Sequence, residues 1–262
     1  MRTIAGLCWG VIPARGGSKT IPLKNLAPLA GRPLIDYSVL AAEACSAVSR
    51  LICSTDSDRI ADHCRSLGVE VHQRPARLGA DSTPVFDVIA HLLNDIAARE
   101  DAVAEFVALL QPTSPFLLPE HIEACVRTLI DDRQAESAQT VVPCPHSQHA
   151  INQRVVVDGQ VAFRFSEERR RAPNKQSKQP HWLFGNLVVF RSTSALEQGS
   201  VFAEPSLAVP ISRPYDLDAD EPQDFELAEL MVAHGFVDLP HLCRGARGKA
   251  RRPSTRKRRT RS

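Results

Sequence analysis

The stretch Val11-Ile-Pro-Ala-Arg-Gly-Gly-Ser-Lys-Thr-Ile-Pro-Leu-Lys-Asn25 continues from an apolar run over residues 4–12. Such a run predicts a buried strand, and the paired glycines after it allow the backbone to approach ligand oxygen atoms closely. Ser18 and neighbouring N–H groups can donate hydrogen bonds, and positive charge comes from Arg15, Lys19 and Lys24. The stretch therefore predicts a polyphosphate-binding loop at the first crossover from strand to helix.

Strand-length apolar runs alternate with helical patterns along the chain. The runs cover residues 4–12, 51–54, 69–72, 106–110 and 140–142, and the helical patterns cover residues 33–48, 56–67, 83–98 and 119–130. This alternation is typical of strand–helix–strand units with right-handed crossovers. We therefore expect an α/β domain with a doubly wound, mostly parallel sheet.

Residues 144–182 interrupt this alternation with a polar segment that contains two strand-like pieces, residues 154–157 and 160–165. Val157-Asp-Gly-Gln160 between them is typical of a hairpin turn. A two-stranded unit of this kind is not stable alone, so we expect it to pack on another subunit. The predicted organisation is an α/β domain over residues 1–143 and 183–243 with an inserted dimerisation extension over residues 144–182.

Composition places the chain among globular proteins. Its 262 residues suffice for one substantial core, and 43% of them are hydrophobic. No apolar run reaches the roughly 18 to 20 residues that span a bilayer, and the N-terminal run predicts a strand and not a signal peptide. Seven scattered cysteines without a Cys-x-x-Cys pair favour reduced thiols over disulfides or a zinc site. We expect a cytoplasmic protein that makes no membrane contact.

Charge is distributed unevenly between the body of the chain and its C-terminal end. Residues 244–262 hold ten of the 32 Lys and Arg residues and no acid, so 22 basic and 30 acidic residues remain elsewhere. This composition predicts a disordered basic tail. A solvated terminus is the simplest interpretation, and a weak contact with a polyanion such as nucleic acid is the alternative.

The loop fits neither Gly-x-x-x-x-Gly-Lys-[Ser/Thr] nor Gly-x-Gly-x-x-Gly. It resembles the signature of the acylneuraminate cytidylyltransferases, enzymes that make CMP-sialic acid and its relatives, whose loop reads Ile-Pro-Ala-Arg-Gly-Gly-Ser-Lys-x-Ile-Pro-x-Lys-Asn. Leu110-Gln-Pro-Thr-Ser-Pro115 also matches that family's strand-four motif letter for letter. In all, five motifs of the family occur in this chain, in the family's order, over about residues 8–235. The resemblance implies a Rossmann-like nucleotidyltransferase fold and, for residues 144–182, a homodimer contact.

The resemblance also implies a nucleotide site for CTP. Its residues are Ala14, Arg15, Gly16, Gly17, Ser18, Lys19, Lys24, Asn25 and Arg74. Arg74 is expected to contact the cytosine or the ribose. Two acids in the matching motifs, Asp56 and Asp81, are as consistent with bracing loops as with binding.

Asp216-Leu-Asp218-Ala-Asp220 supplies carboxylates of the kind that Mg²⁺ prefers. On an extended segment, side chains two residues apart point to the same side, so Asp216 and Asp218 are predicted to hold one ion. Asp220 is interpreted as the cap of the following helix, and an acidic loop without a metal is the alternative. An EF-hand is excluded because Leu227 occupies the position of its bidentate glutamate. The expected catalytic set is Arg15, Lys24, Asp216 and Asp218.

The acceptor side departs from the family pattern. Gln111 and Ser114 are expected beside the first loop, because ligands lie at the carboxyl ends of parallel strands. Lys175-Gln176 stands where the family has an arginine followed by glutamine, and Gly185-Asn186 reverses its Asn-Gly. Lysine neutralises a carboxylate without forming arginine's bidentate fork. In a slipped alignment, that arginine is one of Arg169, Arg170 and Arg171.

The function that the resemblance implies is the coupling of CTP to a 2-keto-3-deoxy sugar acid, giving a CMP-sugar and pyrophosphate. A cytidylyltransferase with another acceptor, such as a phosphonate, is the first alternative. A non-catalytic protein that binds a nucleotide or a nucleic acid is the second.

Overall fold

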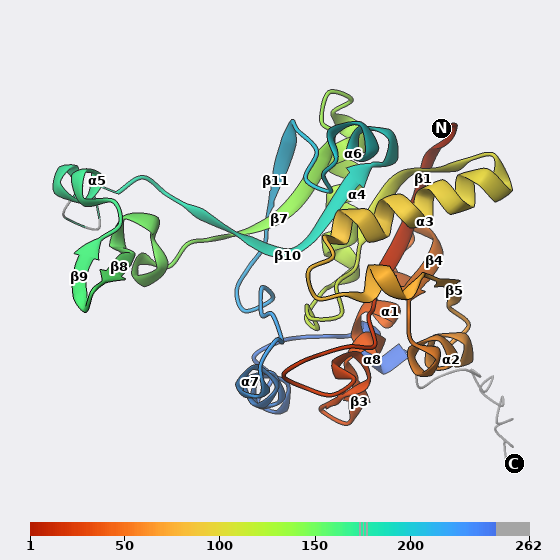
Figure 1. The fold of residues 1–262 in the computed structure, drawn as a ribbon, viewed down its shortest axis with the longest axis horizontal. Helices are drawn as coiled ribbons and strands as arrows, with labels where there is room; N and C mark the ends of the chain where they lie inside the picture. The colour runs from red at the N-terminus through yellow and green to blue at the C-terminus, as the bar shows by residue number, and fades with distance from the viewer. Residues whose placement is uncertain (173, 175, 177, 245–262) are drawn as a thin grey trace, which may run out of the picture.

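The computed structural model describes residues 1–172, 174, 176 and 178–244. Within them, seven strands form one sheet in the order β11-β7-β10-β6-β1-β4-β5 (Figure 1). The strands are β1 (Thr3–Pro13), β4 (Val48–Thr55), β5 (Glu70–Gln73), β6 (Val103–Leu109), β7 (Ser137–Pro143), β10 (Trp182–Arg191) and β11 (Ser206–Pro210). Two parts of the sequence predictions lie outside the described residues: Lys175, and the basic tail that follows Arg244.

The sheet is mostly parallel, as predicted. β1 pairs in parallel with β4 and β6, β4 with β5, and β7 with β11. β10 is antiparallel to both of its neighbours, β6 and β7. The reason is visible in Figure 1: β7 runs out of the body toward the insertion, and β10 brings the chain back beside it.

Helices cover both faces of the sheet. Cys8 and Ile12 of β1 belong to a core shared with α1 (Leu34–Ala44), α2 (Asp58–Ser66) and α4 (Pro119–Asp131). Trp9 and Val11, which alternate with them, belong to a second core shared with α3 (Val85–Glu100) and α6 (Ser192–Gln198). Because alternate residues of a strand point to opposite faces, this division shows the doubly wound arrangement that the sequence predicted.

A third apolar cluster holds the C-terminal segment against the N-terminal loops. It joins Phe225 and Ala228 of α7 (Pro222–Ala233) to Leu29 of the short hairpin β2 (Pro28–Leu29) and β3 (Arg32–Pro33). The backbone N–H of Ala30 in that hairpin donates to Glu229 on α7 at 2.9 Å. The short helix α8 (His241–Arg244) lies against α1.

The insertion forms a separate small unit that projects from the body (Figure 1). It contains β8 (Arg154–Val157), β9 (Gln160–Phe163), α5 (Ser166–Arg171) and the 3-10 turns η3 (His146–Gln148) and η4 (Ala150–Asn152). β8 and β9 pair around Asp158 and Gly159, which both have positive φ, so the predicted hairpin is confirmed. Val156 and Val161 are cross-strand partners, and they are 69% and 66% exposed.

Gly185 and Asn186, at the departure from the family pattern, lie inside the sheet. A Cβ on Gly185 would lie 2.6 Å from Thr140 Oγ1 on β7. Asn186 is buried, and its Nδ2 donates to the Tyr215 carbonyl at 2.8 Å and to His121 Nδ1 at 3.1 Å. Asn186 therefore joins β10 to α4 and to the chain that precedes Asp218.

His121 links the start of α4 to this network in its neutral form. Its Nδ1 accepts from Asn186 and faces the Leu118 N–H at 3.4 Å. Burial lowers the pKa of His121 from 6.5 to about 4, because the charged ring would lose its hydration.

Among the described residues, the helices include none that is long and apolar enough to cross a membrane.

Stability should fall at acidic pH because of His121. Its pKa is lower in the folded chain, so the unfolded chain binds the proton more tightly, and stability is lost as pH falls from 6.5 toward 4. His121→Asn keeps an acceptor near the position of Nδ1 and should remove up to about 3 kcal/mol of this dependence. Urea unfolding across this pH range measures the difference between the two proteins. Parallel pH profiles would contradict the assignment.

Candidate functional site

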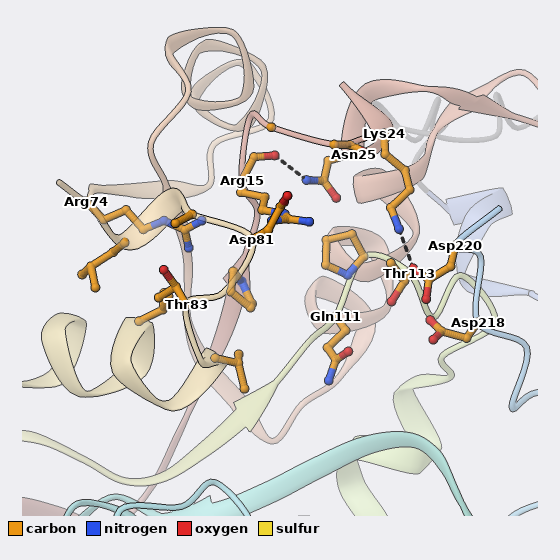
Figure 2. A pocket seen from close by; sticks show the side chains of 18 residues that line it. Arg15, Lys24, Asn25, Arg74, Asp81, Thr83, Gln111, Thr113, Asp218 and Asp220 are labelled. Carbon is orange, nitrogen blue, oxygen red and sulfur yellow. Dashed lines mark hydrogen bonds and ion pairs between the residues drawn. The ribbon is translucent and has the colours of Figure 1, made fainter. Parts of the chain in front are cut away.

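A cavity of 360 Å³ lies at the carboxyl ends of β1 and β6, as expected for an open parallel sheet (Figure 2). Segments distant in the sequence form its wall: the loop after β1, residues 74–88, residues 111–113 after β6, and the chain before α7. Its lining includes Arg15, Gly17, Ser18, Lys24, Asn25, Arg74, Asp81, Thr83, Gln111, Thr113, Asp218 and Asp220.

Contacts with neighbouring elements fix the shape of the loop after β1. The Gly16 N–H donates to Asp56 Oδ1 at 3.0 Å, and a Cβ on Gly16 would lie 2.8 Å from Ser57 Cβ. Asn25, in the turn η1 (Lys24–Leu26), donates from Nδ2 to the Arg15 carbonyl at 2.9 Å. Ala14 is buried, and its N–H donates to the Ser54 carbonyl at 3.0 Å. Ala14 and Gly16 thus shape the loop, while Gly17 and Ser18 line the cavity.

Asp56 braces two sides of the cavity at once. Besides Gly16, it faces the Arg74 guanidinium, with an Nη2 to Oδ1 distance of 3.6 Å. On the other side, a Cβ on Gly79 in the turn η2 (Ala76–Gly79) would lie only 2.1 Å from Asp56 Oδ2. The η2 turn can approach Asp56 this closely only because position 79 is glycine, whereas the glycine at position 16 makes room for Ser57.

Arg74 is a buried cation in the cavity wall. Its side chain is 3% exposed, and its Nη1 donates to the Ser54 carbonyl at 3.4 Å. Burial lowers the pKa of the guanidinium, and Asp56 offsets part of that effect. Its Nε has no hydrogen-bond partner within the described part of the chain. A buried N–H without a partner is costly, so a ligand acceptor that met it would be stabilised.

The loop cations contact carboxylates across the cavity. Arg15 and Lys19 both bind Asp81, and Lys19 does so at 2.7 Å. Lys19 and Arg15 hold the pKa of Asp81 below its usual range. Lys19 is 83% exposed and lies outside the lining, whereas Lys24 lines it and pairs with Asp220 at 2.5 Å.

Asp218 and Asp220 are the acidic pair on the far wall (Figure 2). Burial raises the pKa of Asp218, the Thr113 side chain lowers it by hydrogen bonding, and the charge of Asp220 raises it further. The Ala219 N–H donates to the Thr113 carbonyl at 2.7 Å, which fixes the segment between the two acids.

Asp216 does not join Asp218 at the cavity. It lies in a turn over residues 213–216 and pairs with Arg213 at 3.1 Å, so the extended geometry assumed for residues 216–220 begins only after it. The interpretation of Asp220 as the cap of the following helix is wrong. Glu221 is the N-cap of α7, and the N–H groups of Asp220 and Glu221 donate to Asp224 Oδ2 at 3.0 and 2.7 Å.

The residues expected on the acceptor side lie in different places. Gln111 lines the cavity. Ser114 is buried beside it, where its N–H closes a turn onto the Gln111 carbonyl at 3.0 Å. Gln176 is exposed on the insertion, next to the undescribed Lys175. Sequence reasoning missed Thr83 and Thr113, although Thr113 lay within the motif that matched the family.

Comparison with known proteins agrees with this geometry. Residues 9–169 match the model of the cytidylyltransferase family. The chain belongs to that family. It is 31% identical to the CMP-N,N'-diacetyllegionaminic acid synthase of Legionella pneumophila, over 85% of this chain and 94% of that protein. It is 30% identical to the N-acylneuraminate cytidylyltransferase of Escherichia coli over 83% of this chain, but it spans only 50% of that relative's length.

A solved structure described as CMP:2-keto-3-deoxy-manno-octonic acid synthetase complexed with CTP is similar to this cytidylyltransferase in fold. The TM-score is 0.65, with 18% identity over 87% of this chain and 99% of the other. At this identity the likeness concerns the fold alone. It agrees with the predicted nucleotidyltransferase architecture.

Proposed function

We propose that this cytidylyltransferase couples CTP to a 2-keto-3-deoxy sugar acid of the sialic or nonulosonic type, giving a CMP-sugar and pyrophosphate. The observation that carries the proposal is one cavity that joins the cationic glycine loop to the Asp218–Asp220 pair. Relatives named as N-acylneuraminate cytidylyltransferase and CMP-N,N'-diacetyllegionaminic acid synthase support the acceptor class.

The nucleotide is proposed to bind along the loop after β1. Loop N–H groups and Ser18 would donate to the phosphates, and their charge would be neutralised by Arg15, Lys19 and Lys24. Arg74, with its unpartnered Nε, would contact the cytosine or the ribose. Gly17 would let the phosphates approach the backbone, and Ala14, Gly16 and Asn25 would hold the loop in shape.

Mg²⁺ is proposed as the metal, held by Asp218 and Asp220. Two adjacent carboxylates that line the same cavity fit a divalent cation that takes its other ligands from water and phosphate. Because the described residues hold no cluster of three or more metal-ligating side chains, water and phosphate would have to supply the other ligands. Asp216 is replaced in this role because it pairs with Arg213. When bound, the metal would supply positive charge to the transferred phosphate.

In the proposed reaction, the anomeric hydroxyl of the acceptor attacks the α-phosphate of CTP in line. A new P–O bond forms, the bond from the α-phosphorus to the oxygen that bridges to the β-phosphate breaks, pyrophosphate leaves with that oxygen, and the hydroxyl proton passes to solvent water. Arg15, Lys19 and Lys24 would stabilise the charge that develops on the departing pyrophosphate. Gln111 lies on the wall where the acceptor would enter between strand β6 and the acidic pair, and Ser114 would support it from the adjoining turn.

The insertion is proposed to make a homodimer contact. It projects from the body (Figure 1). Its hairpin also exposes the cross-strand pair Val156 and Val161. Because β7 and β10 carry it away from the sheet, Gln176 would contact an acceptor most directly in a second copy. Lys175 keeps the acceptor role proposed from the sequence. The proposed cytoplasmic location agrees with the six free cysteines in the described part of the chain.

CTP should be the preferred nucleotide, and a nine-carbon 2-keto-3-deoxy acid should be the preferred acceptor. In the presence of Mg²⁺, pyrophosphate release from CTP should exceed release from ATP, GTP or UTP, because the site is proposed to contact the cytidine through Arg74. The measurement is a pyrophosphate assay over the four nucleotides and a panel that includes a phosphonate. Turnover of the phosphonate alone, or equal rates with all four nucleotides, would contradict the proposal.

Asp218→Asn should lower turnover by ~10²-fold or more, because it removes a charged ligand from the proposed metal site. Asp216→Asn is the matched control two residues away and should stay within a few-fold of wild type. Stabilisation by Mg²⁺ plus CTP, measured by thermal unfolding, should be lost in Asp218→Asn and kept in Asp216→Asn. Loss of this stabilisation in both variants would restore the Asp216–Asp218 pair predicted from the sequence, and its retention in Asp218→Asn would contradict the metal role of Asp218.

The dimer should depend on the exposed valines. Replacing both Val156 and Val161 with Asp places charge at the proposed contact, and sedimentation velocity should then show monomers. Ile130→Asp, at another apolar position that is 52% exposed, is the control and should leave a dimer. A wild-type chain that sediments as a monomer at micromolar concentration would exclude the contact.

A further inference from the structure

Each cation at the cavity is paired with a carboxylate in the free chain. Lys24 pairs with Asp220, Arg74 faces Asp56, and both Arg15 and Lys19 bind Asp81. A triphosphate must therefore displace carboxylates in order to bind these cations. The carboxylates differ in whether another partner remains for them after this exchange.

Asp81 is the carboxylate that such an exchange leaves without a partner. Asp56 keeps the Gly16 N–H, and Asp220 lies beside Asp218 at the proposed metal site. Within the described chain, the ion pairs and hydrogen bonds of the Asp81 side chain go to Arg15 and Lys19 alone. A ligand that takes both cations leaves a free negative charge next to its own phosphates.

The position of Asp81 allows it to reach the phosphate loop without belonging to it. It follows η2 on the opposite wall, and Figure 2 shows its carboxylate directed at the Arg15 guanidinium. It is 40% exposed, so it can turn toward water when a ligand arrives. Both Arg15 and Asp81 line the cavity, so their contact occupies the space that phosphate oxygens would need.

We propose that Asp81 is a built-in competitor of the phosphates for Arg15 and Lys19, and that it promotes release of pyrophosphate. It holds the two cations in place before the nucleotide binds. After transfer it takes them back from the pyrophosphate, which has no cytidine to retain it. This inference rests on the proposed function, because it assigns the leaving group to these cations.

The sign of the effect separates this role from a structural one. Asp81→Asn keeps the size of the side chain and removes the competing charge, so pyrophosphate should bind more tightly. A residue that merely braced the loop would weaken binding when replaced. CMP lacks the outer phosphates, so its affinity should not change.

The test is calorimetric titration of the full chain with pyrophosphate, CMP and CTP in the presence of Mg²⁺ at 0.15 M salt. Asp81→Asn should lower the dissociation constant for pyrophosphate about ten-fold. Asp81→Ser should act in the same direction, and Asp81→Glu should restore the wild-type value. Asp62→Asn removes an equal charge from an exposed pair on α2 and should change nothing. The inhibition constant for pyrophosphate in steady-state turnover should fall in parallel.

An unchanged or higher dissociation constant for pyrophosphate in both Asp81→Asn and Asp81→Ser would overturn the inference. So would an equal gain in affinity for CMP. The CTP titration of wild type separates the two proposals: if CTP binds and the pyrophosphate constant does not fall, only the role of Asp81 fails. A wild-type chain that binds no CTP would refute the proposed function and this inference together.

Discussion

The carboxylate of Asp56 sets the spacing between the two walls of the cavity. One oxygen accepts the Gly16 N–H at 3.0 Å and faces Arg74 at 3.6 Å. The other lies where a Cβ on Gly79 would come within 2.1 Å. A side chain at Gly79 would displace this carboxylate from the Gly16 N–H and from the Arg74 guanidinium. Because Arg15 and Asp81 belong to these two walls, their contact across the cavity depends on the same spacing.

The order of strands and helices was predictable, but the direction of one strand was not. Alternating apolar runs and helical patterns predicted the parallel strands β1, β4, β5, β6 and β7, since each is followed by a helix or an insertion that begins at the same edge. The apolar run over residues 187–190 predicts a strand, but its pattern does not indicate whether that strand is parallel or antiparallel to its neighbours. Its antiparallel pairing in β10 follows from the path of the chain, which leaves the body along β7 and returns beside it.

The phosphate loop was also predictable, because one continuous string carries its chemistry. The acidic pair was not, since the choice between Asp216 and Asp220 depends on contacts from outside that segment. Arg213 holds Asp216 in a turn, and Thr113 anchors Ala219 from the end of another strand. Asp81 shows the same limit, because its partner Arg15 lies 66 residues away. The contacts of Thr113 with Ala219 and of Arg15 with Asp81 join residues far apart in the sequence, so spacing along the chain could not assign them.

The departure from the family pattern at Gly185 and Asn186 concerns packing and not the surface that an acceptor would touch. Asn186 is 1% exposed, and Gly185 lies against Thr140 with no room for a side chain. Through the Tyr215 carbonyl, the Asn186 amide fixes the start of the chain that leads to Asp218. A buried amide of this kind must keep its partners, because each lost hydrogen bond leaves a polar group without solvent. Asn186 therefore influences the cavity by positioning the acidic segment, and the proposed acceptor would be recognised by other residues.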